Sequence, residues 1–140
     1  MKDELITFPT AKLAKEKGFN EDCYEHYHIR EDDTVLADNE AGYLECTNLE
    51  DYLHSNESLR DNEYSAPTQS LLQRWLRENH SIHILMNVGM NDGTKQTFYC
   101  NVCLFGKNLY KSTFRSKISV YTYEEALEIG LFQALLLIKC

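Results

Sequence analysis

Apolar side chains recur with the clearest periodicity in the second half of the chain. Between residues 82 and 120 they alternate with polar ones, which is typical of strands that bury one face. On both sides of that region they recur every three or four residues, which is typical of amphipathic helices. The pattern predicts the order α-β-β-β-α, with helices at 67–79 and 123–138 and strands at 82–90, 95–105 and about 109–120.

The last of these helices has the strongest local signals. Thr122, followed three residues later by Glu125, forms a capping box at its start. Its apolar positions extend nearly all round the helix, so we expect it to be the centre of the core or, in part, an interface. The main buried stripe is predicted to comprise Leu127, Leu131, Ala134, Leu135 and Ile138.

The first half of the chain has a weaker pattern. Thr7 and Gly18 are suited to begin and end a short helix at about 8–17, and Phe19 is expected to fold back onto its last turn. All of this fits one α+β domain, residues 1–140, with an antiparallel sheet packed by helices. The other elements expected in the first half are strands at 23–29, 34–37 and 43–46, a brief helix at 48–54 and a surface loop at 55–63.

The net charge of −8 is distributed unevenly between the two halves. Residues 1–64 carry 17 Asp or Glu against 6 Lys or Arg, whereas residues 65–140 carry 5 against 8. Because phosphate binding depends on the number of cations, the chain as a whole is not expected to attract nucleic acid. A local basic face in the second half is compatible with these counts.

The sequence predicts a cytoplasmic protein. Its first ten residues lack the apolar run of a secretory leader, and its longest apolar stretch, 134–138, is too short to span a bilayer. Five cysteines without a framework spacing favour free thiols in a reducing compartment. We expect no membrane contact.

Three stretches of the sequence, YSAPTQSLLQRWLREN, YEEALEIGLFQALLLI and AKLAKEKGF, carry a resemblance to known proteins. They resemble small uncharacterised proteins of phages and other mobile elements from gut bacteria of the Bacteroides group. The resemblance covers most of the chain and is local and compositional. It implies a cytoplasmic accessory protein of a mobile element and identifies no catalytic residue.

The order of elements in 65–140 also resembles that of double-stranded-RNA-binding domains. That family carries lysines at the start of its last helix, where they hold phosphates across the groove. Here the same position reads Thr122-Tyr123-Glu124-Glu125, which is acidic. The resemblance therefore implies a similar topology without binding of duplex RNA.

Two groups of residues could hold a metal. Cys100 and Cys103 form a C-x-x-C pair, but inside a strand their thiols would point to opposite faces. Cys23, His26 and His28 are a second, weak candidate, because His26 and His28 share one face of a strand. No spacing identifies the remaining ligands, so we expect no bound metal and no cofactor.

The candidate binding surface is a row of cations on the third strand. Lys111, Arg115 and Lys117 are evenly spaced and are expected to lie opposite Phe114 and Ile118. The row fits either an edge strand protected from pairing by its charge or a docking face for an anionic partner.

Three functional hypotheses follow, and the sequence favours a binding protein over an enzyme. The first is a non-enzymatic binding protein of a phage or mobile element, with a host protein or an anionic ligand as partner. The second is a nucleic-acid-binding module that uses the basic strand 109–117. The third is a metal-dependent enzyme at Cys23, His26 and His28. A homodimer is compatible with all three.

Overall fold

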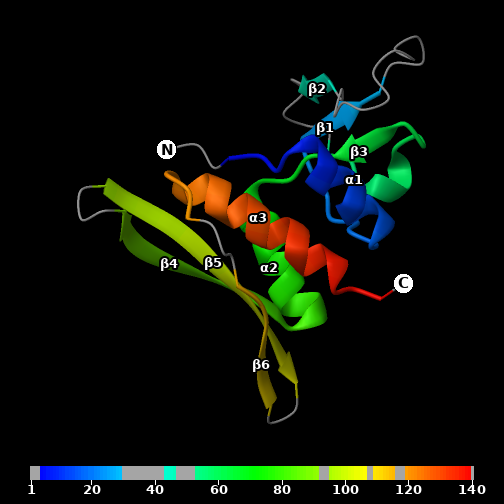
Figure 1. Cartoon of the computed structure of the whole chain (residues 1–140). Coiled ribbons are helices and arrows are strands. Elements are labelled where there is room, and N and C mark those ends of the chain that lie inside the picture. Colours follow the sequence, from blue (N-terminus) through cyan, green and yellow to red (C-terminus); the bar gives the residue numbers. More distant parts are fainter. Residues whose placement is uncertain are drawn as a thin grey trace. The chain divides into compact units, whose positions relative to one another are not determined.

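The computed structural model describes residues 4–29, 43–46, 53–91, 95–106, 109–115 and 119–139. Its contacts group the chain into two compact units, Leu5–Thr68 and the chain from Gln69 onward with Glu4. The boundary lies close to the change of charge after residue 64. Both units combine helices with antiparallel strands, which confirms the α+β class (Figure 1).

The first unit contains a three-stranded antiparallel sheet in the order β2-β1-β3. The predicted first helix is present and ends as expected, because Gly18 has a φ of 94° and the N–H of Phe19 donates to the carbonyl of Ala14 at 2.9 Å. Phe19 is buried. The elements of this unit are α1 (Phe8–Glu16), β1 (Glu25–His28), β2 (Tyr43–Cys46), the 3₁₀ helix η2 (Asn56–Ser58) and β3 (Glu63–Ser65).

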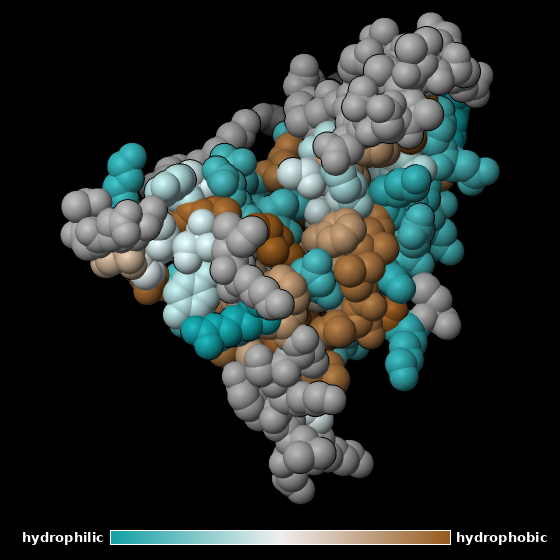
Figure 2. Space-filling view, viewed as in Figure 1, coloured by the Kyte–Doolittle hydropathy of each residue, from teal (hydrophilic) through white to brown (hydrophobic). Residues whose placement is uncertain are grey.

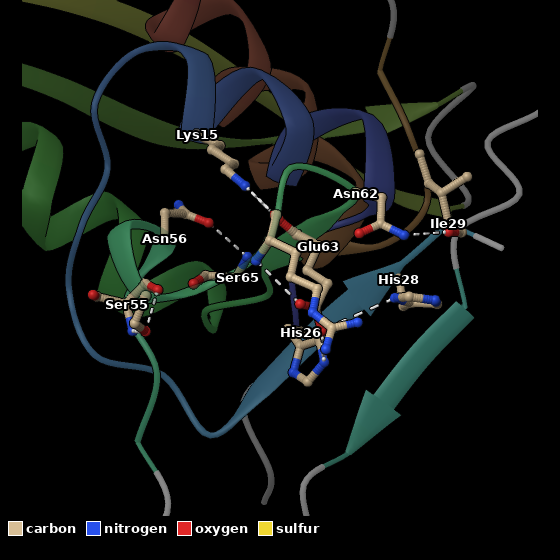
Figure 3. A network of polar contacts seen from close by, with 11 residues as sticks. Lys15, His26, His28, Ile29, Ser55, Asn56, Asn62, Glu63 and Ser65 are labelled. Atoms are coloured by element: carbon tan, nitrogen blue, oxygen red, sulfur yellow. Dashed lines mark hydrogen bonds and ion pairs between the residues drawn. The ribbon is translucent and has the colours of Figure 1, made fainter. Parts of the chain in front are cut away.

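The segment predicted as a surface loop at 55–63 is instead partly structural. Asn56 is buried, and its Nδ2 donates to the carbonyl of Phe19 at 2.7 Å. Its Oδ1 accepts from the N–H of Ser65 at 2.8 Å (Figure 3). The Asn56 amide therefore satisfies two backbone groups that would otherwise be buried without partners. The polar composition of residues 55–63 gave no indication that Asn56 is buried and bonds these backbone groups.

Several predictions in the first half fall outside the described residues. These are the strand at 34–37 and most of the brief helix at 48–54, of which only Leu53 and His54 are described. His54 pairs with Cys23 in an isolated antiparallel bridge rather than lying in a helix.

The second unit consists of a three-stranded antiparallel sheet in the order β4-β5-β6 and two helices. Strand β4 pairs with β5 in continuous register, from Ile82 opposite Leu104 to Asn91 opposite Lys95. This arrangement confirms the predicted order of the C-terminal part. Its elements are α2 (Gln69–His80), β4 (Ile82–Asn91), β5 (Lys95–Gly106), β6 (Leu109–Arg115) and α3 (Tyr123–Leu136).

Helix α3 lies against one face of this sheet. A Cβ on Gly130 would stand 2.8 Å from Cγ2 of Ile84 and 3.1 Å from Sγ of Cys100, so the glycine allows the helix to approach the strands closely. The hydroxyl of Thr122 accepts from the N–H of Glu125, which confirms the N-cap. All five residues of the predicted stripe are buried.

Helix α2 completes the core of this unit. Trp75 is buried and its ring meets that of His80 edge to face at 4.7 Å, as expected for a core tryptophan. In Figure 2 apolar side chains gather over the C-terminal half of α3, where Leu136 is 50% exposed.

Candidate functional site

Of the three cations predicted to form one row on the third strand, Arg115 is the one whose side chain the structure describes. In the pairing of β6 with β5, Lys111 lies opposite Leu104 and Arg115 lies opposite Asn101, with a register shift between them. Such a shift is a β-bulge, which adds one residue to a strand and reverses the alternation beyond it. The shift lies between positions 111 and 115, so simple alternation does not hold along the whole of β6, and the row of cations stays a prediction. Lys117 lies outside the described residues.

The face that carries Arg115 has no helix on it in the described part of the chain. Helix α3 contacts the other face, where Ile84 and Cys100 lie. Helix α2 lies beside α3, since Nε2 of Gln69 donates to the carbonyl of Glu124. We call the helix-free side the open face. Two side chains on this face, Thr97 and Cys103, are buried. The exposed or half-buried side chains of the open face are His83, Leu85, Asn87, Lys95, Tyr99, Asn101, Phe105 and Arg115.

Strand pairing arranges these side chains in rows across the sheet. Asn101, on the central strand, lies between Leu85 on β4 and Arg115 on β6. In the next row Tyr99 lies opposite Asn87. Successive rows on one face are two residues apart, or about 7 Å. A hydrogen-bonding amide, an aromatic ring and a cation are therefore neighbours.

Tyr99 lies next to Gly89 on the neighbouring strand. Its Cε1 lies 3.8 Å from the point where a Cβ on Gly89 would stand, and Oγ1 of Thr97 lies 3.1 Å from that point. The guanidinium carbon of Arg115 is 5.6 Å from the centre of the Tyr99 ring. This distance is typical of a cation–π interaction, so Arg115 and Tyr99 form a cation–π pair.

Two further aromatic rings, those of Phe105 and Tyr121, lie further along the sheet on either side of Tyr99. Phe105 is 40% exposed and meets the ring of His83 edge to face at 4.5 Å. It follows Tyr99 by six residues on β5, which corresponds to about 20 Å on the same face. On the other side of Tyr99, the ammonium of Lys95 lies 5.5 Å from the centre of the exposed Tyr121 ring.

The strands that form the sheet contain no carboxylate. Neither Asp nor Glu occurs in 82–91, 95–106 or 109–115, although the chain has 22 of them. The carboxylates of α2 and α3 belong to the helix layer; they are Glu78, Glu124, Glu125 and Glu128. An anion that approaches the open face therefore meets cations without a fixed negative charge on the strands.

The two amides of the open face each have an atom without a hydrogen bond. Nδ2 of Asn87 and Oδ1 of Asn101 are buried and have no partner within the described residues. Such atoms are rare in folded proteins.

The histidines predicted as weak metal candidates converge on a carboxylate that sequence reasoning missed. Nε2 of His26 lies 3.2 Å from Oε2 of Glu63, and Nδ1 of His28 lies 4.0 Å from the same oxygen (Figure 3). Strand pairing produces this arrangement, because β3 places Glu63 opposite His28. Among the described residues, no three His, Cys, Asp or Glu side chains are placed to hold a metal ion.

The third candidate ligand, Cys23, has a different environment. Its Sγ donates to the carbonyl of Glu21 at 3.6 Å. Burial, reinforced by the charges of Asp22 and Glu21, raises the pKa of the Cys23 thiol to about 12. Metal binding needs the thiolate, so this environment opposes a ligand role. The metal-enzyme hypothesis has no further support in the described residues.

The C-x-x-C pair behaves as the strand pattern predicts. Cys100 and Cys103 are both buried, free thiols on β5. Cys100 faces Gly130 of α3, whereas Cys103 lies opposite His83 at a position that belongs to the open face. Burial raises the pKa of Cys100 to about 11, so its thiol stays protonated at neutral pH. The pair is part of the packing of the sheet.

No known protein family, curated protein or solved structure matches the chain. No helix in the described part of the chain is long and apolar enough to cross a membrane. The chemistry of the open face is therefore the observation from which a function can be inferred.

Proposed function

We propose that the protein binds single-stranded nucleic acid through the open face. The observation that carries this proposal is the combination of Tyr99, Phe105 and Arg115 on strands that contain no carboxylate. Unpaired bases stack on aromatic side chains and on arginine, while cations hold the phosphates. The amides of Asn87 and Asn101 supply donors and acceptors for base edges.

A single strand fits this surface better than a duplex. Stacking on a ring requires an unpaired base, because both faces of a base in a duplex are covered by its neighbours. The start of α3, which holds phosphates in double-stranded-RNA-binding domains, here carries the exposed carboxylates of Glu124 and Glu125. An acidic protein would satisfy Arg115 but would offer no planar group to stack on Tyr99 or Phe105.

The proposed setting is the cytoplasm. Cys23, Cys100 and Cys103 are free thiols, as expected in a reducing compartment. The resemblance inferred from the sequence, to small uncharacterised proteins of phages and mobile elements, implies the same setting. Single-stranded RNA and single-stranded DNA both occur there, and they share the chemistry on which the proposal depends.

Fluorescence anisotropy with labelled oligonucleotides tests the proposal. Single strands of RNA and DNA and a hairpin duplex are titrated with the full chain, and we expect the duplex to bind at least tenfold more weakly. Each phosphate contact to a single strand contributes about −0.7 to the slope of log K against log salt, so contacts from Lys95 and Arg115 predict about −1.4. Equal binding of the duplex, or no binding of either single strand at low salt, would contradict the proposal.

A further inference from the structure

Strand β4 lies at one end of its sheet and lacks the features that usually protect such an edge. Natural edge strands are protected by charges, proline or bulges. The ten residues of β4, Ile82–Asn91, include no charged residue and no proline, and their register with β5 is continuous. Among the described residues, no strand pairs with the outer edge of β4.

The pairing with β5 identifies the backbone groups that point outward. The N–H of Phe105 donates to the carbonyl of Ser81 at 3.0 Å, so Ser81 and Phe105 form a hydrogen-bonded pair. Such pairs alternate along an antiparallel ladder, and the residues between them point their N–H and C=O groups away from the partner. In β4 these are the even-numbered residues, Ile82, Ile84, Met86, Val88 and Met90.

A second observation supports this assignment. Phe98, which lies opposite Val88, exchanges both of its backbone hydrogen bonds with Val120 on the other side of β5, at 2.7 and 2.9 Å. Its backbone groups therefore point away from β4. The pair Val88–Phe98 is a non-hydrogen-bonded one, which leaves the backbone groups of Val88 for the outer edge.

Half of this edge is already covered. Nε2 of Gln73 on α2 donates to the carbonyl of Ile84 at 3.4 Å, so α2 shields the beginning of β4. The open part runs from Met86 to Met90. Here the side chains of Val88 and Met90 are 58% and 63% exposed. Within the described residues, a backbone edge without a partner strand thus coincides with exposed apolar side chains.

We propose that this edge pairs with the β4 strand of a second copy of the chain. In the antiparallel dimer Val88 lies opposite Val88 of the partner subunit, and Met86 lies opposite Met90 of the partner subunit. This register uses only the open half of the edge and leaves the contact of Gln73 intact. Three facing pairs would form about six backbone hydrogen bonds.

A second copy fits this edge better than another partner. Pairing about a twofold axis places the same surface on both sides, so a strand that suits one copy suits the other. Because β4 has no charged residue, two copies bring no like charges together. The axis runs through the sheet, so the two open faces lie on the same side of one six-stranded sheet. The dimer does not depend on nucleic acid binding.

Proline at position 88 gives the sharpest test. The N–H of Val88 points outward, so Val88→Pro removes an edge donor without removing a hydrogen bond to β5. In sedimentation experiments we expect the wild type to reach twice the chain mass of 16.3 kDa as its concentration rises. Val88→Pro should remain a monomer with an unchanged circular dichroism spectrum.

Val88→Lys provides a second variant, which is decisive if the proline variant does not fold. A lysine on an edge strand opposes pairing without disturbing the ladder. The matched control is Gln96→Lys, an exposed position on the central strand β5 near the same end of the sheet, which should still dimerise.

Hydrogen exchange locates the interface at single residues. In the wild type the amides of Met86, Val88 and Met90 should become protected as concentration rises, and in Val88→Lys they should exchange rapidly at every concentration. A wild type that stays monomeric at high concentration, or a dimer that persists when position 88 is lysine in a folded chain, would overturn the proposal.

Discussion

Leu135→Ala should lower the free energy of unfolding of the second unit by about 2–5 kcal/mol, the range for a buried leucine truncated in a core. Leu135 is completely buried and lies on the face of α3 that packs into the core. Domain stabilities are about 5–15 kcal/mol, so the loss is a large fraction of the total. Chemical denaturation followed by fluorescence is suitable, because the single tryptophan, Trp75, belongs to the same unit.

The next residue provides the control. Leu136 is 50% exposed on the same helix, so Leu136→Ala removes the same atoms without leaving a buried cavity. Surface substitutions of this kind usually change stability by less than about 0.5 kcal/mol. If Leu135→Ala were no more destabilising than Leu136→Ala, the assignment of α3 to the core would be wrong.

The second large effect concerns ligand binding. Tyr99→Leu and Phe105→Leu keep apolar bulk on the open face and remove the rings on which bases would stack. Each lost stacking contact costs about 1–3 kcal/mol, or about 5-fold to 150-fold in the dissociation constant. The two rings are about 20 Å apart along β5, so their effects should add in the double variant.

Tyr24→Leu is the matched control for these variants. Tyr24 is 50% exposed but belongs to the first unit, so its replacement should leave the affinity unchanged. Anisotropy titrations at low salt compare the four variants with the wild type. If the double variant bound the oligonucleotide as tightly as the wild type, the rings of Tyr99 and Phe105 would not be part of the binding surface.

The elements with strong local signals could be predicted from the sequence. The capping residue Thr122 and the apolar stripe from Leu127 to Ile138 define α3 almost completely, and the structure places them as expected. The first helix is equally well marked by Gly18 and Phe19. In both cases neighbours in the sequence are also neighbours in space, so local chemistry is sufficient.

The exact register of the strands and the contacts that it creates could not be predicted from the sequence. Nothing in Ser112-Thr113-Phe114 signals a bulge, because the register of β6 is determined by its partner strand. The approach of Glu63 to His26 and His28 likewise requires a pairing between distant segments. The open face left one signal in the sequence, namely the absence of Asp and Glu from three successive strands. That signal becomes informative only when the uncovered face of the sheet is known.

Chemical-shift mapping of the side chains tests the central claim most directly. An unlabelled single-stranded oligonucleotide is added to isotope-labelled protein, and side-chain signals from the two faces of one sheet are compared. If the open face binds the strand, the methyl groups of Leu85 and the amide groups of Asn87 and Asn101 should shift together. The methyl groups of Ile84 and Val102, which are buried on the helix side, should stay in place. Shifts confined to the helices or to the first unit, or no shifts at saturating oligonucleotide, would contradict the account.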